Sequence, residues 1–136
     1  MNTNPYAKSL TTDSWKGGDC EESVIDRPRE ADLLEAIDRL DERVYTLVIV
    51  GGEGEAHLAV GGGRGRFVVY ATFDNRTFHN LVERGRPGGV ITIVAGGQAG
   101  EYPACQVVDR ERAIRAASRF LSEGRLGEDL GWEVQP

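Results

Sequence analysis

Three apolar stretches between residues 44 and 73, separated by clusters of glycine, dominate the hydrophobic pattern of the chain. The first, residues 44–50, is almost continuously apolar, as is typical of a strand covered on at least one face. In the next two, residues 55–60 and 66–73, apolar and polar side chains alternate. Because glycine-rich turns separate the stretches, the pattern predicts a β-meander.

The two faces of this meander differ in character, because side chains switch faces at every residue of a strand. The third stretch directs Phe67, Val69 and Ala71 to an apolar face, where we expect helices to pack. The opposite face carries a mixed set of side chains, which are Glu55, His57, Tyr70 and Thr72. The mixed face is therefore left for solvent or for a partner.

Two other stretches have the apolar spacing of an amphipathic helix. The first is predicted to begin with Asp26 as its N-cap and Pro28 in its first turn. Its apolar stripe consists of Leu33, Leu34, Ile37 and Leu40. The second is predicted to run from an N-cap at Asp109 to a stop at Gly124. Its apolar stripe consists of Ala113, Ile114, Ala117, Phe120 and Leu121.

Weaker patterns flank these elements. Residues 1–5 are polar and expected to be loose, and residues 6–25 predict an N-terminal hairpin at the sheet edge, where polar strands are tolerated. Trp15, at the turn of this hairpin, is expected to pack as an apolar side chain at the rim of the domain. Residues 90–94 predict a fourth strand, and residues 102–108 predict a fifth in which Pro103 favours an edge or a bulge.

The order of these elements indicates the fold class. Residues 74–89 are predicted to connect the third and fourth strands, with a short helical turn near residues 78–82. Strands grouped together, with helices at either end of the group, predict an α+β fold. We expect a mainly antiparallel meander sheet of about five to six strands with two helices packed on one face, in a single domain spanning residues 1–136.

The balance of charges limits the class of partner. The formal net charge of −6 disfavours nucleic acid and anionic membrane and allows a basic protein partner. Four arginines offer a basic patch but lack the aromatic residues that a single-strand nucleic-acid binder interleaves with them. These arginines are Arg64, Arg66, Arg84 and Arg86.

The cellular setting follows from the apolar runs and the cysteines. No apolar run approaches the roughly 20 residues of a membrane span, and the N-terminus lacks the basic and apolar regions of a signal peptide. We therefore expect a cytoplasmic protein that does not bind a membrane. In that reducing setting Cys20 and Cys105 are expected to be free thiols.

The glycine run at Gly61–Gly63, followed by Arg64 and Gly65, invites comparison with a phosphate-binding loop. Such a loop must lead from a strand into a helix, so that the helix N-terminus faces the phosphates. Here a β-branched and aromatic run follows, and no GK[ST] motif is present. A hairpin turn is the better interpretation, and no cofactor is predicted.

The inventory of catalytic and metal-binding residues is small. His57 and His79 are the only histidines, and no CxxC, HxxxH or HExxH spacing occurs, so neither a catalytic nor a metal site is predicted. One alternative stays open: a small α+β enzyme or ligand-binding domain that uses Cys105 with His79 or His57. A buried, inert Cys105 is the favoured interpretation. A structural or regulatory subunit is a third hypothesis.

Two longer patterns carry a resemblance to a known family. The C-terminal sequence VVDRERAIRAASRFLSEG leads, after a short gap, to Leu130-Gly131-Trp132. Further upstream, an acidic helix precedes a strand–glycine turn–strand meander, DLLEAIDRLDERVYTLVIVGGEGEAHLAVGGGRGRFVVY. Over residues 24–133 the chain resembles the first-numbered family of bacterial polymorphic-toxin immunity proteins. It departs from the family pattern at residues 127–129, where such proteins often have a proline.

The resemblance implies a non-enzymatic inhibitor that binds a cognate toxin and blocks it. We expect the free protein to be a monomer. Toxins of these systems are often nucleic-acid deaminases or nucleases. Such toxins require a positively charged groove, which an acidic protein can fill. Candidate contacts lie in the acidic turns and on the open sheet face, and they are Glu53, Glu55, Tyr70, Asp74, Glu101 and Tyr102. Trp132, which carries the family pattern, is expected to pin the tail onto the core.

Overall fold

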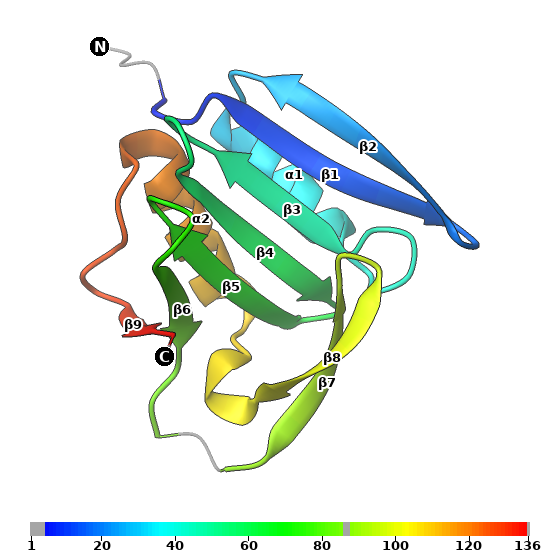
Figure 1. The fold of residues 1–136 in the computed structure, drawn as a ribbon, viewed down its shortest axis with the longest axis vertical. Helices are drawn as coiled ribbons and strands as arrows, with labels where there is room; N and C mark the ends of the chain where they lie inside the picture. The colour runs from blue at the N-terminus through cyan, green and yellow to red at the C-terminus, as the bar shows by residue number, and fades with distance from the viewer. Residues whose placement is uncertain (1–4, 86–87, 136) are drawn as a thin grey trace.

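An antiparallel sheet of seven strands forms the centre of the computed structural model, which describes residues 5–85 and 88–135 (Figure 1). Its strand order is β2-β1-β3-β4-β5-β6-β9. The bounds are β1 Ser9–Lys16, β2 Asp19–Asp26, β3 Leu47–Gly51, β4 His57–Gly63, β5 Arg66–Thr72, β6 Phe78–Val82 and β9 Gly131–Val134. Within the described ranges, β7 (Val90–Ala95) and β8 (Gln98–Pro103) form a separate hairpin, and a 3-10 helix, η1 (Ala104–Gln106), follows it.

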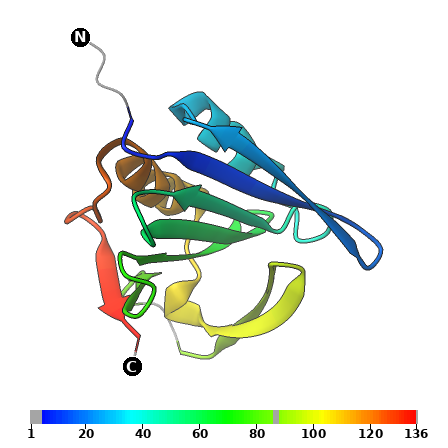
Figure 2. The ribbon, with the colours of Figure 1, turned by 45° about the horizontal axis from the view of Figure 1, so that its top comes forward.

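Two helices, α1 (Glu30–Arg39) and α2 (Arg110–Glu123), lie against the same face of the sheet (Figures 1 and 2). Between helices and sheet lies one apolar core, in which Phe120, Leu33, Ile37, Leu58 and Val60 are fully buried. The α+β class, the antiparallel sheet and the helices on one face are therefore confirmed. The strands are more numerous than the five to six predicted.

An ion pair joins the two helices on the solvent side of this core. Arg110 donates from Nε to Asp38 Oδ1 at 2.6 Å and from Nη2 to Asp38 Oδ2 at 2.9 Å. Hydrogen bonding and charge from the guanidinium lower the pKa of Asp38 below its usual range. The acidic surface of α1 is thus partly engaged within the protein.

The helix ends test the capping predictions. Asp109 caps α2 by accepting a hydrogen bond from the Arg112 N–H at 2.9 Å, and Gly124 ends it in a left-handed conformation, as predicted. The N-cap of α1 was predicted wrongly: Asp26 is the last residue of β2, and the cap is Arg29. The intervening Arg27 has a φ of +51° and turns the chain out of the sheet before the helix begins.

The segment predicted as a helical turn near residues 78–82 is the strand β6. It pairs with β5 on one side and with β9 on the other, so its conformation is set by two neighbours that are distant in sequence. The fifth strand also differs from its prediction at residues 102–108: β8 ends at Pro103, and η1 follows. Residues 1–4 of the terminus predicted to be loose lie outside the described residues. Arg86, one of the four arginines of the predicted basic patch, also lies outside them.

The glycine cluster after residue 60 was predicted as a turn, but Gly61–Gly63 belong to β4. Only Arg64 and Gly65 form the turn, and both have positive φ, at +57° and +82°, as a two-residue hairpin loop requires. A Cβ atom at Gly63 would lie 2.6 Å from the Leu40 carbonyl oxygen, and one at Gly61 would lie 2.5 Å from the Ala95 Cβ. The glycines are needed because the exit of α1 and strand β7 pass close to β4.

Candidate functional site

The face of the sheet opposite the helices is hollowed into a groove of about 240 Å³, here called the open-face groove. The sheet forms its floor, and the β7–β8 hairpin, which stands out from the sheet in Figures 1 and 2, forms one wall. The lining residues are all uncharged, and most are apolar: Leu47, Ala59, Gly61, Val68, Val69, Tyr70, Asn80, Ala95, Tyr102, Gln106 and Gln135. The volume of this groove is below the roughly 300–1,000 Å³ of typical small-molecule pockets.

Tyr70, a predicted contact, projects from β5 into this groove and is half buried. Its hydroxyl lies 3.3 Å from Nε2 of His57, whose Nδ1 lies 3.0 Å from the Glu55 carbonyl oxygen. Because a carbonyl only accepts, Nδ1 carries the proton in neutral His57 and Nε2 accepts from Tyr70. Burial raises the pKa of Tyr70, so its hydroxyl remains a donor at neutral pH. Phe78 packs edge-on against the Tyr70 ring at 5.7 Å.

The two predicted contacts from β8 point to different sides of that strand. Tyr102 is half buried and lines the groove, so the fold brings it to the same site as Tyr70. Glu101, the preceding residue, is exposed and does not line the groove. The prediction thus named two aromatic residues of one groove without indicating that they share it.

The other acidic residues lie at one end of the sheet. Because His57 on β4 pairs with Thr72 on β5, the β3–β4 and β5–β6 connections share that end. Glu53 and Glu55 are exposed in the first, and Glu53 forms a surface ion pair with Lys8 at 3.5 Å. Asp74 is exposed in the second. These three carboxylates form a rim at the end of the sheet rather than a wall of the groove.

The β5–β6 turn uses part of this polar set for its own structure. Asp74 Oδ1 accepts hydrogen bonds from the N–H groups of Thr77 and Arg76, both at 2.8 Å, and these bonds lower the pKa of Asp74. Thr72, which the alternation placed on the open face, is fully buried beneath the turn and donates to the Thr77 carbonyl at 2.7 Å. Thr72 is therefore not available to a partner.

Sequence reasoning missed a buried polar cluster that holds one end of the groove. Asp13 on β1 is buried and accepts hydrogen bonds from the Thr46 and Leu47 N–H groups at 2.7 and 2.9 Å. It also accepts from the Thr46 hydroxyl and from Trp15 Nε1, the latter at 2.7 Å. Gly97, in the β7–β8 turn, donates its N–H to Thr46 Oγ1 at 2.9 Å. The cluster fixes β1, the start of β3 and the groove wall to one another.

The alternative site of Cys105 with a histidine has no geometry to support it. The Cys105 carbonyl accepts a hydrogen bond from the Glu83 N–H at 2.7 Å, just beyond the end of β6. His79 lies four residues before Glu83, and four residues of a strand span about 13 Å along the chain. The His79 ring packs against Phe73. His57 is engaged with Glu55 and Tyr70. Among the described residues, no hydrogen bond joins the Cys105 thiol to either imidazole. Cys105 is only half buried, so the prediction of a buried thiol was wrong.

Two further properties of the described residues bear on function. No group of three or more histidine, cysteine, aspartate or glutamate side chains is placed to hold a metal ion among residues 5–85 and 88–135. In the same ranges, no helix has both the length and the apolar character that a membrane crossing requires.

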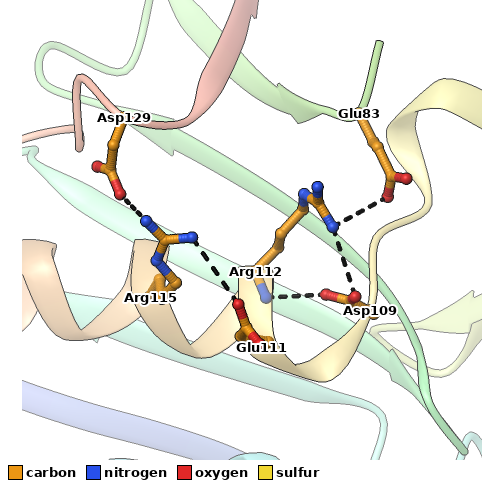
Figure 3. Close-up of polar contacts among 6 residues, drawn as sticks. All are labelled: Glu83, Asp109, Glu111, Arg112, Arg115 and Asp129. Carbon is orange, nitrogen blue, oxygen red and sulfur yellow. Dashed lines mark hydrogen bonds and ion pairs between the residues drawn. The ribbon is translucent and has the colours of Figure 1, made fainter. Parts of the chain in front are cut away.

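The C-terminal pattern that carried the family resemblance has a structural role (Figure 3). Arg112 Nη1 of α2 lies 3.4 Å from Glu83 Oε1, just beyond β6, and 3.4 Å from Asp109 Oδ2. Arg115 forms ion pairs with Glu111 and Asp129. The Arg112–Glu83 contact ties α2 to the end of β6, and the Arg115–Asp129 ion pair ties it to the tail. Trp132 on β9 donates from Nε1 to the Gly127 carbonyl at 3.2 Å and packs against the core.

Comparison with known proteins places the chain in a family. A sequence model described as Immunity protein Imm1 matches residues 21–134, which include both helices and every strand after β1 except the first residues of β2. Among individual curated proteins, nothing matches the chain. The family match covers most of the chain and agrees with the resemblance carried by the C-terminal pattern. The chain belongs to the Immunity protein Imm1 family.

Proposed function

We propose that this protein binds a cognate bacterial toxin in the cytoplasm and neutralises it without catalysis. The observation that carries the proposal is the match of the immunity family over residues 21–134. An immunity protein acts on the toxin against which it protects, so the relevant property of the chain is the surface that it presents. We propose a free monomer that binds neither nucleic acid nor membrane.

The toxin is proposed to be a nucleic-acid deaminase or nuclease with a basic active-site groove. The chemistry of the chain supports this class: it carries a formal net charge of −6. Opposite charge speeds the encounter of two proteins and aligns them before contact. An acidic protein seated in a basic groove would occlude the groove against nucleic acid.

The open-face groove is the proposed centre of the contact. Tyrosines that are half buried and rigidly held are frequent anchors of protein interfaces, because they bury a large area at little cost in conformational entropy. Tyr70 and Tyr102 are both half buried in the groove, and Tyr70 is held there by His57 and Phe78. Glu101 lies next to Tyr102. The rim carboxylates Glu53, Glu55 and Asp74 would then face basic residues at the edge of the interface, where charge mainly affects association rate.

Co-expression with the toxin encoded beside this chain tests the proposal. The two proteins are expected to co-purify, and Tyr102→Ala is expected to weaken the complex at least about tenfold, which corresponds to about 1.4 kcal/mol. Tyr45→Ala is the matched control, because Tyr45 does not line the groove. Its ring lies beneath the Arg39 guanidinium, whose Cζ is 5.4 Å from the ring centroid. Thermal unfolding establishes that both variants are folded. Failure of the wild-type proteins to associate at micromolar concentration would overturn the proposed function.

A further inference from the structure

Strand β2 is an edge strand with one neighbour, β1, and every one of its eight residues is exposed. In an antiparallel edge strand, every second residue directs its N–H and C=O groups away from the sheet. Over the length of β2 these groups form a regular row of backbone donors and acceptors. The other edge of the sheet, β9, has four residues and offers a much shorter row.

Negative charge is concentrated beside this row. The β1–β2 hairpin, residues 9–26, contains five carboxylates and one lysine, so it contributes −4 to the formal net charge of −6. Asp13 is buried and hydrogen-bonded within the buried polar cluster, so it does not face a partner. Asp19, Glu21, Glu22 and Asp26 are exposed on β2, and none of them forms an ion pair with another described residue.

Both faces of the edge present the same combination of groups. The register pairs Leu10 with Ile25 and Thr11 with Val24, so these two apolar residues of β2 lie on opposite faces. Val24 is 64% exposed and Ile25 is 40% exposed. Glu22 and Asp26 share the face of Val24, and Asp19 and Glu21 share the face of Ile25. A strand laid along β2 would meet carboxylates and an apolar side chain on each face.

The edge is also held in place before any partner arrives. All eight residues of β2 are in register with β1, from Lys16–Asp19 to Ser9–Asp26. Near the hairpin turn, Trp15 is fixed by its hydrogen bond to Asp13 and lies against Gly97. A partner strand therefore meets a preorganised template, which lowers the entropy cost of pairing.

The charges of β2 determine what can occupy the edge. Two copies of β2 paired edge to edge would bring carboxylates opposite or diagonal to one another, and such like-charge pairs are destabilising. Opposite charges across strands stabilise pairing instead. An extended segment with lysine or arginine at alternate positions satisfies the backbone groups and the carboxylates together.

We propose that β2 accepts an extended, basic segment of the cognate toxin as an additional strand of the sheet. This inference rests on the proposed function, since it names a surface and a binding mode for the same partner. Strand addition derives affinity from main-chain hydrogen bonds and specificity from alternate side chains. The toxin segment would be ordered along β2, with its cations facing Glu22 and Asp26 on one side and Asp19 and Glu21 on the other.

The experiment uses the toxin domain encoded beside this chain, inactivated at its active site, as the probe. In the complex, hydrogen–deuterium exchange of amides within residues 19–26 is expected to slow at least tenfold. Glu21→Lys combined with Glu22→Lys is expected to weaken binding at least tenfold. The matched control is Glu111→Lys with Glu128→Lys, which changes net charge equally at exposed positions on α2 and the following loop, and it is expected to stay within about threefold of wild type.

The outcomes separate this inference from the proposed function. A complex of wild-type affinity formed by the β2 double variant, with exchange in residues 19–26 unchanged, would overturn the edge pairing and leave the proposed function intact. Equal weakening of the complex by the two double variants would show that only the net charge of the protein matters, and it would also overturn the edge pairing. Absence of any complex with the wild-type chain would overturn the proposed function and this inference with it. Circular dichroism verifies that both double variants are folded.

Discussion

Asp13 is the residue whose importance depends most on its surroundings. Its carboxylate accepts hydrogen bonds from four donors of Trp15, Thr46 and Leu47, and Asp13 and Thr46 are themselves buried. In the sequence it is one polar residue in a polar hairpin. Its partner Thr46 is 33 residues away, so no local pattern predicts the bond. Leaving a buried donor without an acceptor costs about 1–3 kcal/mol.

Asp13→Asn is accordingly expected to lower the free energy of unfolding by about 1–3 kcal/mol. The variant places an NH₂ donor where a carboxylate oxygen now accepts hydrogen bonds, so the donors around that oxygen lose their acceptor. Urea unfolding measures the change. Asp19→Asn is the control, since Asp19 is exposed and a surface change of this kind stays within about 0.5 kcal/mol. Equal stability of the two variants would show that the buried cluster is not important for the fold.

At the scale of elements, local signals and distant neighbours determine different features. The periodic apolar stripe, the aspartate cap and the terminal glycine of α2 are adjacent in sequence, which is why that helix was predicted with its correct ends. Strand β6 has no comparable local signal and exists because β5 and β9 lie on either side of it. The glycines of β4 were read as a turn because close approach of α1 and β7 is invisible in the sequence.

Gly63→Ala tests that explanation. Its φ of +152° is unfavourable for alanine, and the new Cβ would lie within 2.7 Å of three backbone atoms of Leu40 and Asp41. We expect a loss of about 2 kcal/mol or more in the free energy of unfolding, from strain and overpacking together.

Gly18→Ala is the matched control, because Gly18 lies at the tip of the β1–β2 hairpin with nothing within 4 Å of a new Cβ. Thermal unfolding of the two variants is the measurement. A Gly63→Ala melting temperature equal to that of wild type would contradict the close packing of β4 against the exit of α1.

For the molecule as a whole, three carboxylates in different parts of the fold share a lowered pKa. Asp38 receives hydrogen bonds from Arg110, and Asp74 from the N–H groups of Thr77 and Arg76. At Asp41, desolvation raises the pKa, but hydrogen bonds from the N–H groups of Tyr45, Arg43 and Val44 outweigh it. The folded protein therefore holds these protons less tightly than the unfolded chain does.

The sign of the pH dependence follows from this difference. A depressed folded-state pKa contributes stability that is present above the ordinary value of 3.8 and is lost as pH falls through the folded-state value. We expect the free energy of unfolding to fall as the pH is lowered from 5 to 3. Asp41→Asn, which keeps an acceptor oxygen but does not titrate, should show a shallower loss, measured by urea unfolding across that range. An identical slope for variant and wild type would contradict this assignment.

The sequence by itself determined the features that depend on neighbours along the chain. Apolar period, helix caps and glycine spacing predicted the α+β class, the central meander and α2, and soft patterns of the same kind pointed to the immunity family. The predicted contacts at Glu53, Glu55, Asp74 and Glu101 stay predictions until a complex is examined. Only the tertiary structure brought Tyr70 and Tyr102 to one groove and left β2 at an open edge. The reason is physical: which strands become neighbours is decided by packing between distant segments, and that packing determines which surface remains for a partner.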